Sequence, residues 1–472
     1  MLNYNLLSIK PSVVIVDSKE INNDRLDSMF YHSKYIKNKS NLIENKIEIR
    51  DLEDISINMN APVGWKGIPS SSYLPNGEGV PLIRGKNIKN LLLDLDSLIG
   101  VEERIYKEQP EIQAQNNDII LTRVGTIGRV CRVPNNLEKI AMGQNLTRVE
   151  LDKSIVKSEY VLAYMASKYG QLQMDRYAYG GVQPSLTNKN IKRLQIPIPS
   201  HEIQKYIGDK VRKAEKLREE AKTLREKAEN ELEKVLKSES FSFNKQKYLF
   251  TNKVTERRID AWYYKPIFER ITDYLEEFTQ VKKLNEITKI GKGFSYSSNK
   301  ELGNIPYLRI SDIRNYRFNI EETLGIPERI YNKREDKRLE NFDIVLAITG
   351  ATIGKAAVVV KDNNEKMTLS ADTAYLRVTN QDEIYPLYLL TFLKTKFGQL
   401  QIKQGITGAT NRHLGLEDIA AIKVPIIDID KQKSIHDKIL KSIKNENQSK
   451  QLIEEAKQDV EDLIEGDLEI DN

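Results

Sequence analysis

This sequence has little of several residue types that would point to a particular class of protein. Cys131 is the single cysteine among 472 residues, so no disulfide can form within the chain, and a reducing compartment is expected. No apolar run reaches the roughly 18 residues of a membrane-spanning helix. Met1 to Lys19 lacks the apolar core of a signal peptide. We therefore expect a cytoplasmic protein with no membrane partner.

Recognisable catalytic and metal-binding motifs are also missing. The four histidines are scattered, and none stands at metal-ligand spacing with a cysteine or a second histidine. Gly350 to Lys355 resembles a phosphate-binding loop but is one residue too short, so a strand-to-turn element with a basic tip is the better interpretation. Glu44-Asn45-Lys46 and Glu335-Asp336-Lys337 have the spacing of a nuclease motif, but no Pro-Asp precedes either. These absences favour a binding protein over an enzyme, with no catalytic or metal site.

What the sequence does contain is a long internal repeat. From Tyr160 to Ile207 a second copy lies 228 residues downstream without a gap, and Gly170-Gln171-Leu172-Gln173 matches Gly398-Gln399-Leu400-Gln401. Earlier stretches match at shifted offsets, among them Arg25-Leu26-Asp27 with Arg258-Ile259-Asp260. A period this long excludes solenoids and propellers, whose units are far shorter. Two similar domains in tandem are predicted, suited to a target that also has two halves.

Each copy combines predicted strands with a predicted helical segment. Short apolar runs broken by Gly, Pro and Asn predict strands at Val80–Ile88, Asp118–Val124 and Ala141–Val149, and at Ile305–Ile310, Asp343–Ile348 and Thr373–Val378. Apolar residues spaced by three and four predict helices at Ser158–Met174 and Tyr385–Ile402. A Gly-rich turn and a proline-containing extended segment follow in each copy. The pattern predicts an α+β protein with two homologous mixed domains.

Each copy ends in a long charged segment with a heptad pattern. In the first, 203–237, the seam residues are Ile207, Ala214, Leu217, Ala221, Leu224, Ala228 and Val235. The second copy keeps the frame with Ile435, Ser442, Ser449, Leu452, Ala456 and Leu463. About 35 helical residues make a rod of roughly 50 Å. One interpretation is a solvated helix packed on its own domain, but the narrow seam favours an antiparallel pair of rods, with Ser238 to Glu256 as linker.

Polar residues near the predicted strand ends and turns are often Arg, Lys, Asn or Gln, which bind phosphates or base edges. The candidates in the first copy are Arg84, Lys86, Asn87, Arg123, Arg129, Gln144, Asn145 and Gln183. Those in the second copy are Lys292, Arg309, Arg314, Asn315, Lys355, Asn411 and Arg412. The net charge of +5 is permissive for nucleic acid without identifying it. Aromatic residues do not interleave with these candidates, which favours duplex over single-stranded DNA.

With these features together, the chain resembles the specificity (S) subunits of type I restriction–modification systems over essentially its whole length. The resemblance rests on the two Arg-x-Asp openings, the Asp-Ile elements at Asp118 and Asp343, and the block that leads into each long helix. It implies two target-recognition domains, 1–199 and 241–427, each reading one part of a split double-stranded DNA sequence. The segments 200–240 and 428–472 would hold the helices of an antiparallel coiled-coil spacer with pseudo-two-fold symmetry.

The resemblance also implies that catalysis belongs to other proteins. This chain would be a non-catalytic subunit that holds two methyltransferase subunits and is joined by two ATP-driven restriction subunits. S-adenosylmethionine, ATP and Mg²⁺ would then bind the partners. Two alternatives stay open from the residues alone. One is a self-contained methyltransferase or nuclease-associated protein, and the other is an adaptor that docks a protein partner without touching DNA.

Overall fold

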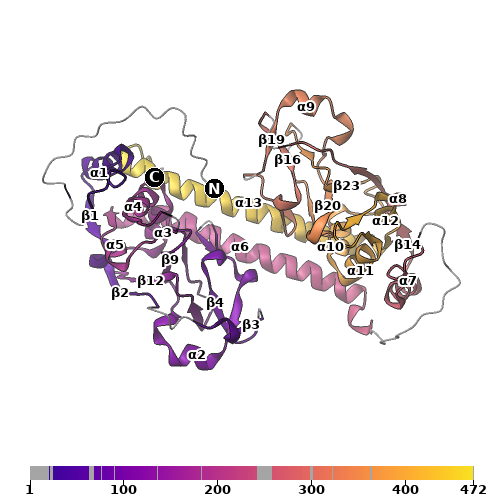
Figure 1. The fold of residues 1–472 in the computed structure, drawn as a ribbon, viewed down its shortest axis with the longest axis horizontal. Coiled ribbons are helices and arrows are strands. Elements are labelled where there is room, and N and C mark those ends of the chain that lie inside the picture. Colours follow the sequence, from indigo (N-terminus) through magenta and orange to yellow (C-terminus); the bar gives the residue numbers. More distant parts are fainter. Residues whose placement is uncertain are drawn as a thin grey trace. The chain divides into compact units, whose positions relative to one another are not determined.

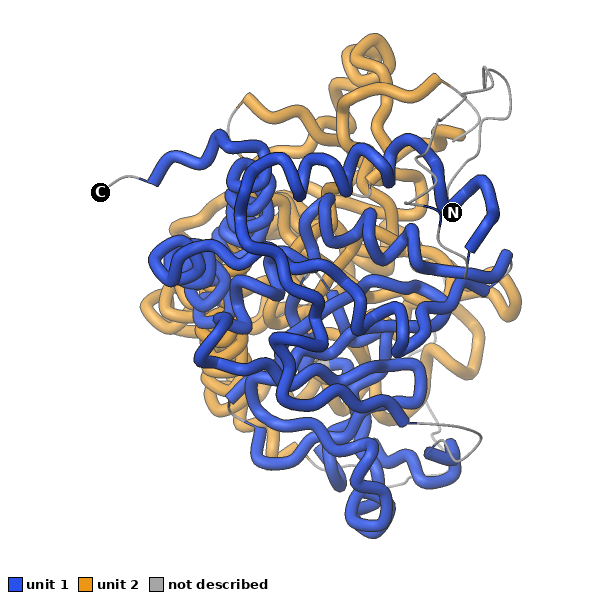
Figure 2. The backbone as a smooth tube through the Cα atoms, turned by 90° about the vertical axis from the view of Figure 1, so that its left-hand side faces the viewer, with its two compact units in different colours: residues 1–217, 447–472 blue, residues 218–446 orange. Residues whose placement is uncertain are grey.

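The chain folds into two compact units, residues 1–217 with 447–472 (unit 1) and residues 218–446 (unit 2), coloured separately in Figure 2. The computed structural model describes residues 21, 25–62, 68–75, 77–89, 91–135, 137–181, 183–241, 258–297, 301–321, 323–361 and 364–470. Most of the predicted linker 238–256 lies outside these residues. The division passes through both long helices, so each unit takes a part of both. The boundaries of the target-recognition domains at 199 and 427 stay a prediction. No helix within the described ranges is long and apolar enough to cross a membrane.

Unit 1 is built around two β-sheets (Figure 1). The four-stranded antiparallel sheet has the order β10-β9-β12-β2, formed by Val130–Arg132, Ile119–Thr122, Leu146–Leu151 and Ser56–Asn60. The five-stranded sheet has the order β3-β7-β4-β11-β8, formed by Tyr73–Leu74, Ile99–Val101, Val80–Ile83, Ile140–Met142 and Gln113–Ala114. Two further pairs join β1 (Glu48–Asp51) to β13 (Gln195–Ile198) and β5 (Ile88–Lys89) to β6 (Leu92–Leu93). The shorter helices are α1 (Ser33–Glu44), α2 (Glu103–Glu108), α3 (Ser158–Ala166), α4 (Lys168–Tyr177) and α5 (Asn188–Lys192).

Unit 2 repeats this plan. Its four-stranded sheet has the order β15-β23-β20-β21, formed by Thr288–Lys292, Thr373–Val378, Ile344–Ala347 and Ala356–Val358. The sheet β19-β16-β22 is formed by Gly325–Ile326, Ile305–Leu308 and Thr368–Leu369, and its pair β16–β22 is parallel, as β4–β11 is in unit 1. The short pairs are β14 (Val281–Lys283) with β26 (Lys423–Pro425), β17 (Ile313–Arg314) with β18 (Arg317–Phe318), and β24 (Ile406–Thr407) with β25 (His413–Leu414). The shorter helices are α7 (Pro266–Phe278), α8 (Leu284–Ile287), α9 (Glu328–Asn332), α10 (Pro386–Lys394), α11 (Lys396–Gly405) and α12 (Leu416–Ala420).

Several predicted elements are broken where the sequence pattern is continuous. The predicted first helix divides into α3 and α4 because Ser167 has extended backbone and its hydroxyl accepts a hydrogen bond from the Gly170 N–H, capping α4. Thr395 caps α11 in the same way. The predicted strand Ala141–Val149 divides at the turn 143–145 into β11 and β12, which belong to different sheets. Each of the other predicted strand ranges does contain a strand.

The strongest sequence matches between the copies correspond to matching buried hydrogen bonds. The Tyr160 hydroxyl donates to the Pro197 carbonyl at 2.8 Å, and the Tyr388 hydroxyl donates to the Pro425 carbonyl. The side chain of Gln173 likewise accepts from and donates to the backbone of residue 195, and Gln401 does the same at residue 423. Buried polar groups need such partners, so the repeat in these segments reflects the scaffold of each unit.

In unit 1, the first half of α6 (His201–Val235) packs against the last part of α13 (Ile429–Glu465). The Ser449 hydroxyl donates to the Ala214 carbonyl at 2.7 Å, and Lys210 pairs with Asp459 at 2.6 Å. Earlier residues of α6 thus meet later residues of α13, so the two helices are antiparallel in this unit. The small Ala and Ser side chains allow the close backbone approach that such a hydrogen bond requires.

Unit 2 contains the same antiparallel contact between the other parts of these helices. The Ser442 hydroxyl donates to the Ala221 carbonyl at 2.7 Å. Further along α6, Glu231 pairs with Lys438 at 2.7 Å. The two Ser–Ala hydrogen bonds are therefore seven residues apart on each helix, which matches the heptad frame read from the sequence.

Burial of the predicted seam follows the seven-residue column, except at Val235, the last residue of α6. Its buried members are Ile207, Ala214, Ala221, Ala228, Ile435, Ser442, Ser449, Ala456 and Leu463, whereas Leu217, Leu224, Val235 and Leu452 are only half-buried. Leu217 and Leu224, three residues after column members, are less buried than the column, so their place in the seam stays a prediction. Val211 and Leu232, four residues after column members, are fully buried instead and join the apolar cores of units 1 and 2. On a helix, the residue three positions after a column member and the residue four positions after it lie on opposite sides of the column. In α6, the side with the residue four positions later faces the core.

Candidate nucleic-acid interface

Three loops of unit 1 converge at one end of its four-stranded sheet. The Arg123 N–H, just after β9, donates to the Asn145 carbonyl in the β11–β12 turn at 2.9 Å. The Gly125 N–H donates to the Pro184 carbonyl in the 179–185 loop at 3.0 Å. Residues that lie about 60 positions apart in the sequence are therefore neighbours in space, and they include several of the predicted DNA-binding candidates.

Most of the candidate side chains at this end of unit 1 are exposed, namely Lys86, Arg129, Gln144, Asn145 and Gln183. The Arg129 guanidinium donates to the Gly85 carbonyl at 3.4 Å, which brings the 84–87 turn to the same place. Arg123 is half-buried, and its guanidinium donates to the carbonyls of Gln144 at 3.0 Å and Pro62 at 3.3 Å. Arg123 therefore holds the loops together, whereas the exposed residues are available to a ligand.

Asn87 does not belong to this exposed group. Its side chain is fully buried, accepts a hydrogen bond from the Arg84 N–H at 2.8 Å and donates to the Ser97 carbonyl and hydroxyl at 2.8 Å. The prediction of DNA contact is wrong for Asn87 because its hydrogen-bonding groups are used inside the fold. Arg84 is half-buried, with its guanidinium 5.9 Å from the centre of the Tyr73 ring.

Unit 2 gathers a smaller set of candidates at the equivalent end of its sheet. The Gly350 N–H donates to the Arg412 carbonyl at 3.0 Å, which joins the β20–β21 turn to the loop between β24 and β25. Lys355, Asn411 and Arg412 are exposed there. Lys292, the last residue of β15, is half-buried and pairs with the beginning of β23. These residues come from three segments, whereas the candidates of unit 1 come from four.

The other candidates of unit 2 lie elsewhere. Arg309 is half-buried and pairs with the buried carboxylate of Asp312 at 3.3 Å. Arg314 and Asn315 are exposed on the β17–β18 hairpin, whose next residue, Tyr316, donates its hydroxyl proton to Glu229 of α6 at 2.8 Å. This hairpin therefore packs against the long helix.

The basic tip of each sheet is positioned by a glycine and a glutamine. Gly128 and Gly354 have φ values of 79° and 94°, a backbone conformation that glycine adopts without steric cost. The Gln171 side-chain amide donates to the Gly128 carbonyl at 2.8 Å, and that of Gln399 donates to the Gly354 carbonyl at 3.1 Å. Two motifs that are far apart in each copy thus meet, and they orient the Arg or Lys that follows each glycine.

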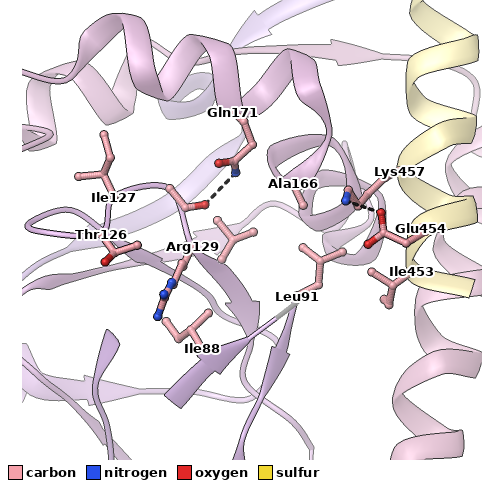
Figure 3. A pocket seen from close by; sticks show the side chains of 12 residues that line it. Ile88, Leu91, Thr126, Ile127, Arg129, Ala166, Gln171, Ile453, Glu454 and Lys457 are labelled. Atoms are coloured by element: carbon pink, nitrogen blue, oxygen red, sulfur yellow. Dashed lines mark hydrogen bonds and ion pairs between the residues drawn. The ribbon is translucent and has the colours of Figure 1, made fainter. Parts of the chain in front are cut away.

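A pocket of about 300 Å³ lies behind the basic tip of unit 1. Figure 3 shows it between the tip, Ala166 and Gln171 of the α3–α4 segment, and Ile453 of α13. In unit 2 the residues at the corresponding sequence positions are larger, with Tyr316 in place of Leu91 and Lys394 in place of Ala166. The Lys394 ammonium lies 4.7 Å from the centre of the Tyr316 ring.

A buried ion cluster in unit 2 connects the sheet region to both long helices. Arg225 of α6 and Arg317 of β18 both contact the Glu446 carboxylate of α13, Arg317 at 2.5 Å. Burial alone would raise the pKa of Glu446, but the two guanidinium groups outweigh it and hold this pKa below its usual range. Glu446 is therefore ionised at neutral pH and depends on both arginines for compensation.

Comparison with known proteins gives consistent matches over most of the chain. Residues 44–233 and 276–458 match the family model described as type I restriction modification DNA specificity domain. The chain is 26% identical over 410 residues to the putative type I restriction enzyme MjaX specificity subunit of Methanocaldococcus jannaschii, which covers 82% of this chain and 86% of that protein. It is 25% identical over 158 residues to the type I restriction enzyme EcoBI specificity subunit of Escherichia coli, covering 34% and 32% of the two chains.

Among solved structures, the chain is similar to the S subunit of a type I restriction–modification system from M. genitalium. The TM-score is 0.44 at 13% sequence identity, with 91% of this chain and 98% of that chain covered.

Proposed function

Because this chain belongs to the family of type I restriction modification DNA specificity domains, we propose that it recognises a split target in double-stranded DNA. Membership of this family implies recognition of a DNA target. The finer proposal is that each unit reads one half of the target. The chain itself carries out no chemistry and directs the catalytic subunits of a complex to the correct site.

The observation that carries this proposal is the pair of exposed polar clusters, one on each unit, built on the same scaffold. Unit 1 presents Arg129, Gln144, Asn145 and Gln183, and unit 2 presents Lys355, Asn411 and Arg412. Arg and Lys side chains bind phosphates and guanine edges, and Asn and Gln pair with adenine edges. The scaffold hydrogen bonds agree between the units while the residues at the tips differ. This pattern supports two related domains that read different base sequences.

We further propose that α6 and α13 form one antiparallel coiled coil that sets the gap between the two half-targets. The Ala214–Ser449 contact in unit 1 and the Ala221–Ser442 contact in unit 2 support it, because they lie one heptad apart on both helices. In this arrangement the number of bases skipped depends on the length of the helices and not on base contacts made by them.

The proposed partners are two methyltransferase subunits and two restriction subunits, as the specificity subunits named among the relatives suggest. S-adenosylmethionine, ATP and Mg²⁺ would bind those partners. This division of labour leaves the present chain with recognition and assembly.

Methylation sequencing of DNA from cells that produce the assembled complex tests the proposal. A methylated motif in two parts, separated by a fixed number of unspecified bases, is the expected result. A continuous motif would contradict the assignment of one half-target to each unit. Failure of the complex to bind duplex DNA would favour the adaptor alternative, and methylation by the isolated chain would contradict the non-catalytic role.

A further inference from the structure

Two exposed apolar side chains occupy the same position in both units. Among the described residues, Ile259 (84% exposed) and Leu26 (73%) are the two most exposed large apolar side chains. They are the middle residues of Arg258-Ile259-Asp260 and Arg25-Leu26-Asp27. A single exposed apolar residue is ordinary on a protein surface. Its recurrence at one position of both repeats is what calls for an explanation.

In unit 1 the residues beside Leu26 hold it in a defined position. Arg25 donates to Asp27 at 2.6 Å and to the Ala178 carbonyl, at the end of α4, at 3.3 Å. The Tyr31 hydroxyl donates to the Arg25 carbonyl at 3.0 Å. The hydrogen bond from Arg25 lowers the pKa of Asp27, so the pair is ionised at neutral pH. The backbone around Leu26 is thus fixed while its side chain faces solvent.

Unit 2 holds Ile259 with the same set of contacts. Arg258 donates to Asp260 at 2.7 Å and to the Gly405 carbonyl, at the end of α11, at 3.3 Å. The Tyr264 hydroxyl donates to the Arg258 carbonyl at 2.5 Å. These contacts explain why the arginine, aspartate and tyrosine recur, but they leave the apolar character of the central residue without a role in the fold.

A second apolar residue follows three positions later in each unit. Met29 is 56% exposed and Trp262 is 44% exposed. Trp262 is fixed by a hydrogen bond from its indole N–H to the Lys403 carbonyl at 2.9 Å. We call the pairs Leu26 with Met29 and Ile259 with Trp262 the apolar knobs. Each knob is therefore an apolar projection on a backbone that its neighbours hold in place, and in unit 2 it includes a tryptophan, a residue type enriched among interface anchors.

The repetition indicates what kind of partner the apolar knobs meet. The polar clusters at the loop tips differ between the units, as contacts with two different half-targets require. The knobs instead keep their character in both units, so their partner meets both units in the same way. Aliphatic side chains do not bind phosphates, and apolar contacts to bases would depend on the sequence. A protein present in two copies fits these conditions.

We propose that each apolar knob inserts into an apolar socket on one methyltransferase subunit, so that the two knobs dock two copies of that protein. This inference rests on the proposed function, because it names the surface through which one of the proposed partners is held. One knob serves each unit, which gives one methyltransferase subunit for each half-target.

The test compares Leu26→Ser and Ile259→Ser with two matched control substitutions. Ile57→Ser and Leu302→Ser remove apolar side chains that are 66% and 63% exposed, one in each unit. Neither control has an apolar residue at the matching position of the other unit. Ile57 lies at an irregularity in the pairing of β2, and β15, the matching strand of unit 2, lacks that irregularity. Leu302 corresponds in the sequence to Gly77. The probe is the methyltransferase subunit of the same restriction–modification system, with stoichiometry and affinity measured by native mass spectrometry and sedimentation.

We expect two methyltransferase subunits per wild-type chain and per control variant. Each single knob variant should weaken the binding of one subunit by roughly 10- to 100-fold, as expected for one large apolar side chain lost from a buried contact. The double variant should weaken both to the same degree. Leu26→Ile and Ile259→Leu should retain both subunits.

The outcomes separate this inference from the proposed function. If the wild-type chain binds no methyltransferase subunit, the proposed function fails and this inference fails with it. If the wild-type chain and the double knob variant both bind two subunits equally, this inference alone is overturned. It is also overturned if the control variants lose binding equally, if only DNA binding is lost, or if the serine variants unfold at lower temperature than the controls. The last result would mean that the chain itself covers the knobs.

Discussion

Removing one heptad from each long helix tests whether helix length sets the gap between the half-targets. The change deletes residues 215–221 of α6 and 443–449 of α13, which have 35 and 37 residues. Both heptad columns stay in frame, and the Ser442 hydroxyl replaces that of Ser449 opposite the Ala214 carbonyl. The deletion also removes Glu215, the ion-pair partner of Arg132, and Glu446, the partner of Arg225 and Arg317, so the variant should be less stable than the wild type. The loop tips are unchanged, so the half-targets themselves should be read as before.

The expected size of the effect follows from the helix geometry. Seven residues at a rise of 1.5 Å shorten each helix by about 10 Å. Base pairs are spaced by about 3.4 Å, so a rod lying along the duplex axis would shorten the gap by about three base pairs. A rod inclined to that axis would shorten it by about one or two. Removing seven residues takes out nearly two turns of each helix and so hardly rotates one end of the rod relative to the other. Three base pairs turn the duplex by about 100°, so the two half-targets would face in different directions. The variant should therefore also bind DNA more weakly.

Methylation sequencing with the variant complex measures the gap directly. The expected motif keeps both half-sequences and has fewer unspecified bases between them. A variant with the deletion in α6 alone is the control, because its unequal helices cannot keep the heptad frame in both units, and it should be less stable to heat than the double deletion. An unchanged gap in the double deletion would refute the idea that the helices act as a ruler. Altered half-sequences would show that the helices take part in base recognition.

Three further predictions concern single residues. Arg129→Ala and Lys355→Ala should each make the complex accept more base sequences in one half of the methylated motif. A side chain that contacts a phosphate should also lower the salt dependence of DNA binding by about one ion when it is removed. A variant with an unchanged motif and an unchanged salt dependence would show that its residue does not contact DNA. Tyr388→Phe leaves the buried Pro425 carbonyl without its hydroxyl donor, so chemical denaturation should show a free energy of unfolding of unit 2 that is lower by about 1–3 kcal/mol. An equal loss of stability in unit 1 would contradict this explanation. Because the pKa of Glu446 is lower in the folded than in the unfolded protein, its ionisation stabilises unit 2 at pH values above the unfolded pKa near 4.5. This stabilisation is lost as the pH falls through the folded pKa. Glu446→Gln should therefore lower the free energy of unfolding at neutral pH by about 3–5 kcal/mol, and this free energy should then fall less steeply in acid than it does in the wild type. Equal pH dependence of the unfolding free energy in the variant and the wild type would refute the role of the cluster with Arg225.

Much of the architecture could be predicted from the sequence because it is encoded locally. The repeat predicted two similar mixed α+β domains, and the heptad column at Ala214 and Ser449 predicted two long helices with small residues at their contact. The glycines of the two basic tips predicted turns after strands, and the structure contains a hairpin turn at both. Each of these features depends on residues close together in the chain, where spacing and backbone preference determine the result.

Other features depended on contacts between distant segments, which a pattern of spacing does not contain. Asn87 has the chemistry of a base-reading residue, but the fold buries it and engages both its amide nitrogen and its amide oxygen, at Ser97 and Arg84. Leu217 fits the heptad as well as Val211 does, yet only Val211 lies on the side of α6 that faces the core. Burial is decided by the packing of whole elements against each other, so it appears only in three dimensions.

The sequence by itself determined that this protein is a tandem pair of domains, each ending in a long helix, because periodicity and internal repetition are properties of the chain. Only the tertiary structure decided which polar residues share a surface and which apolar residues remain outside. Arg123 and Asn145 are separated in sequence but joined by a hydrogen bond. Leu26 and Ile259 have the apolar character of core residues but are left in solvent, because the contacts of their neighbours hold them there.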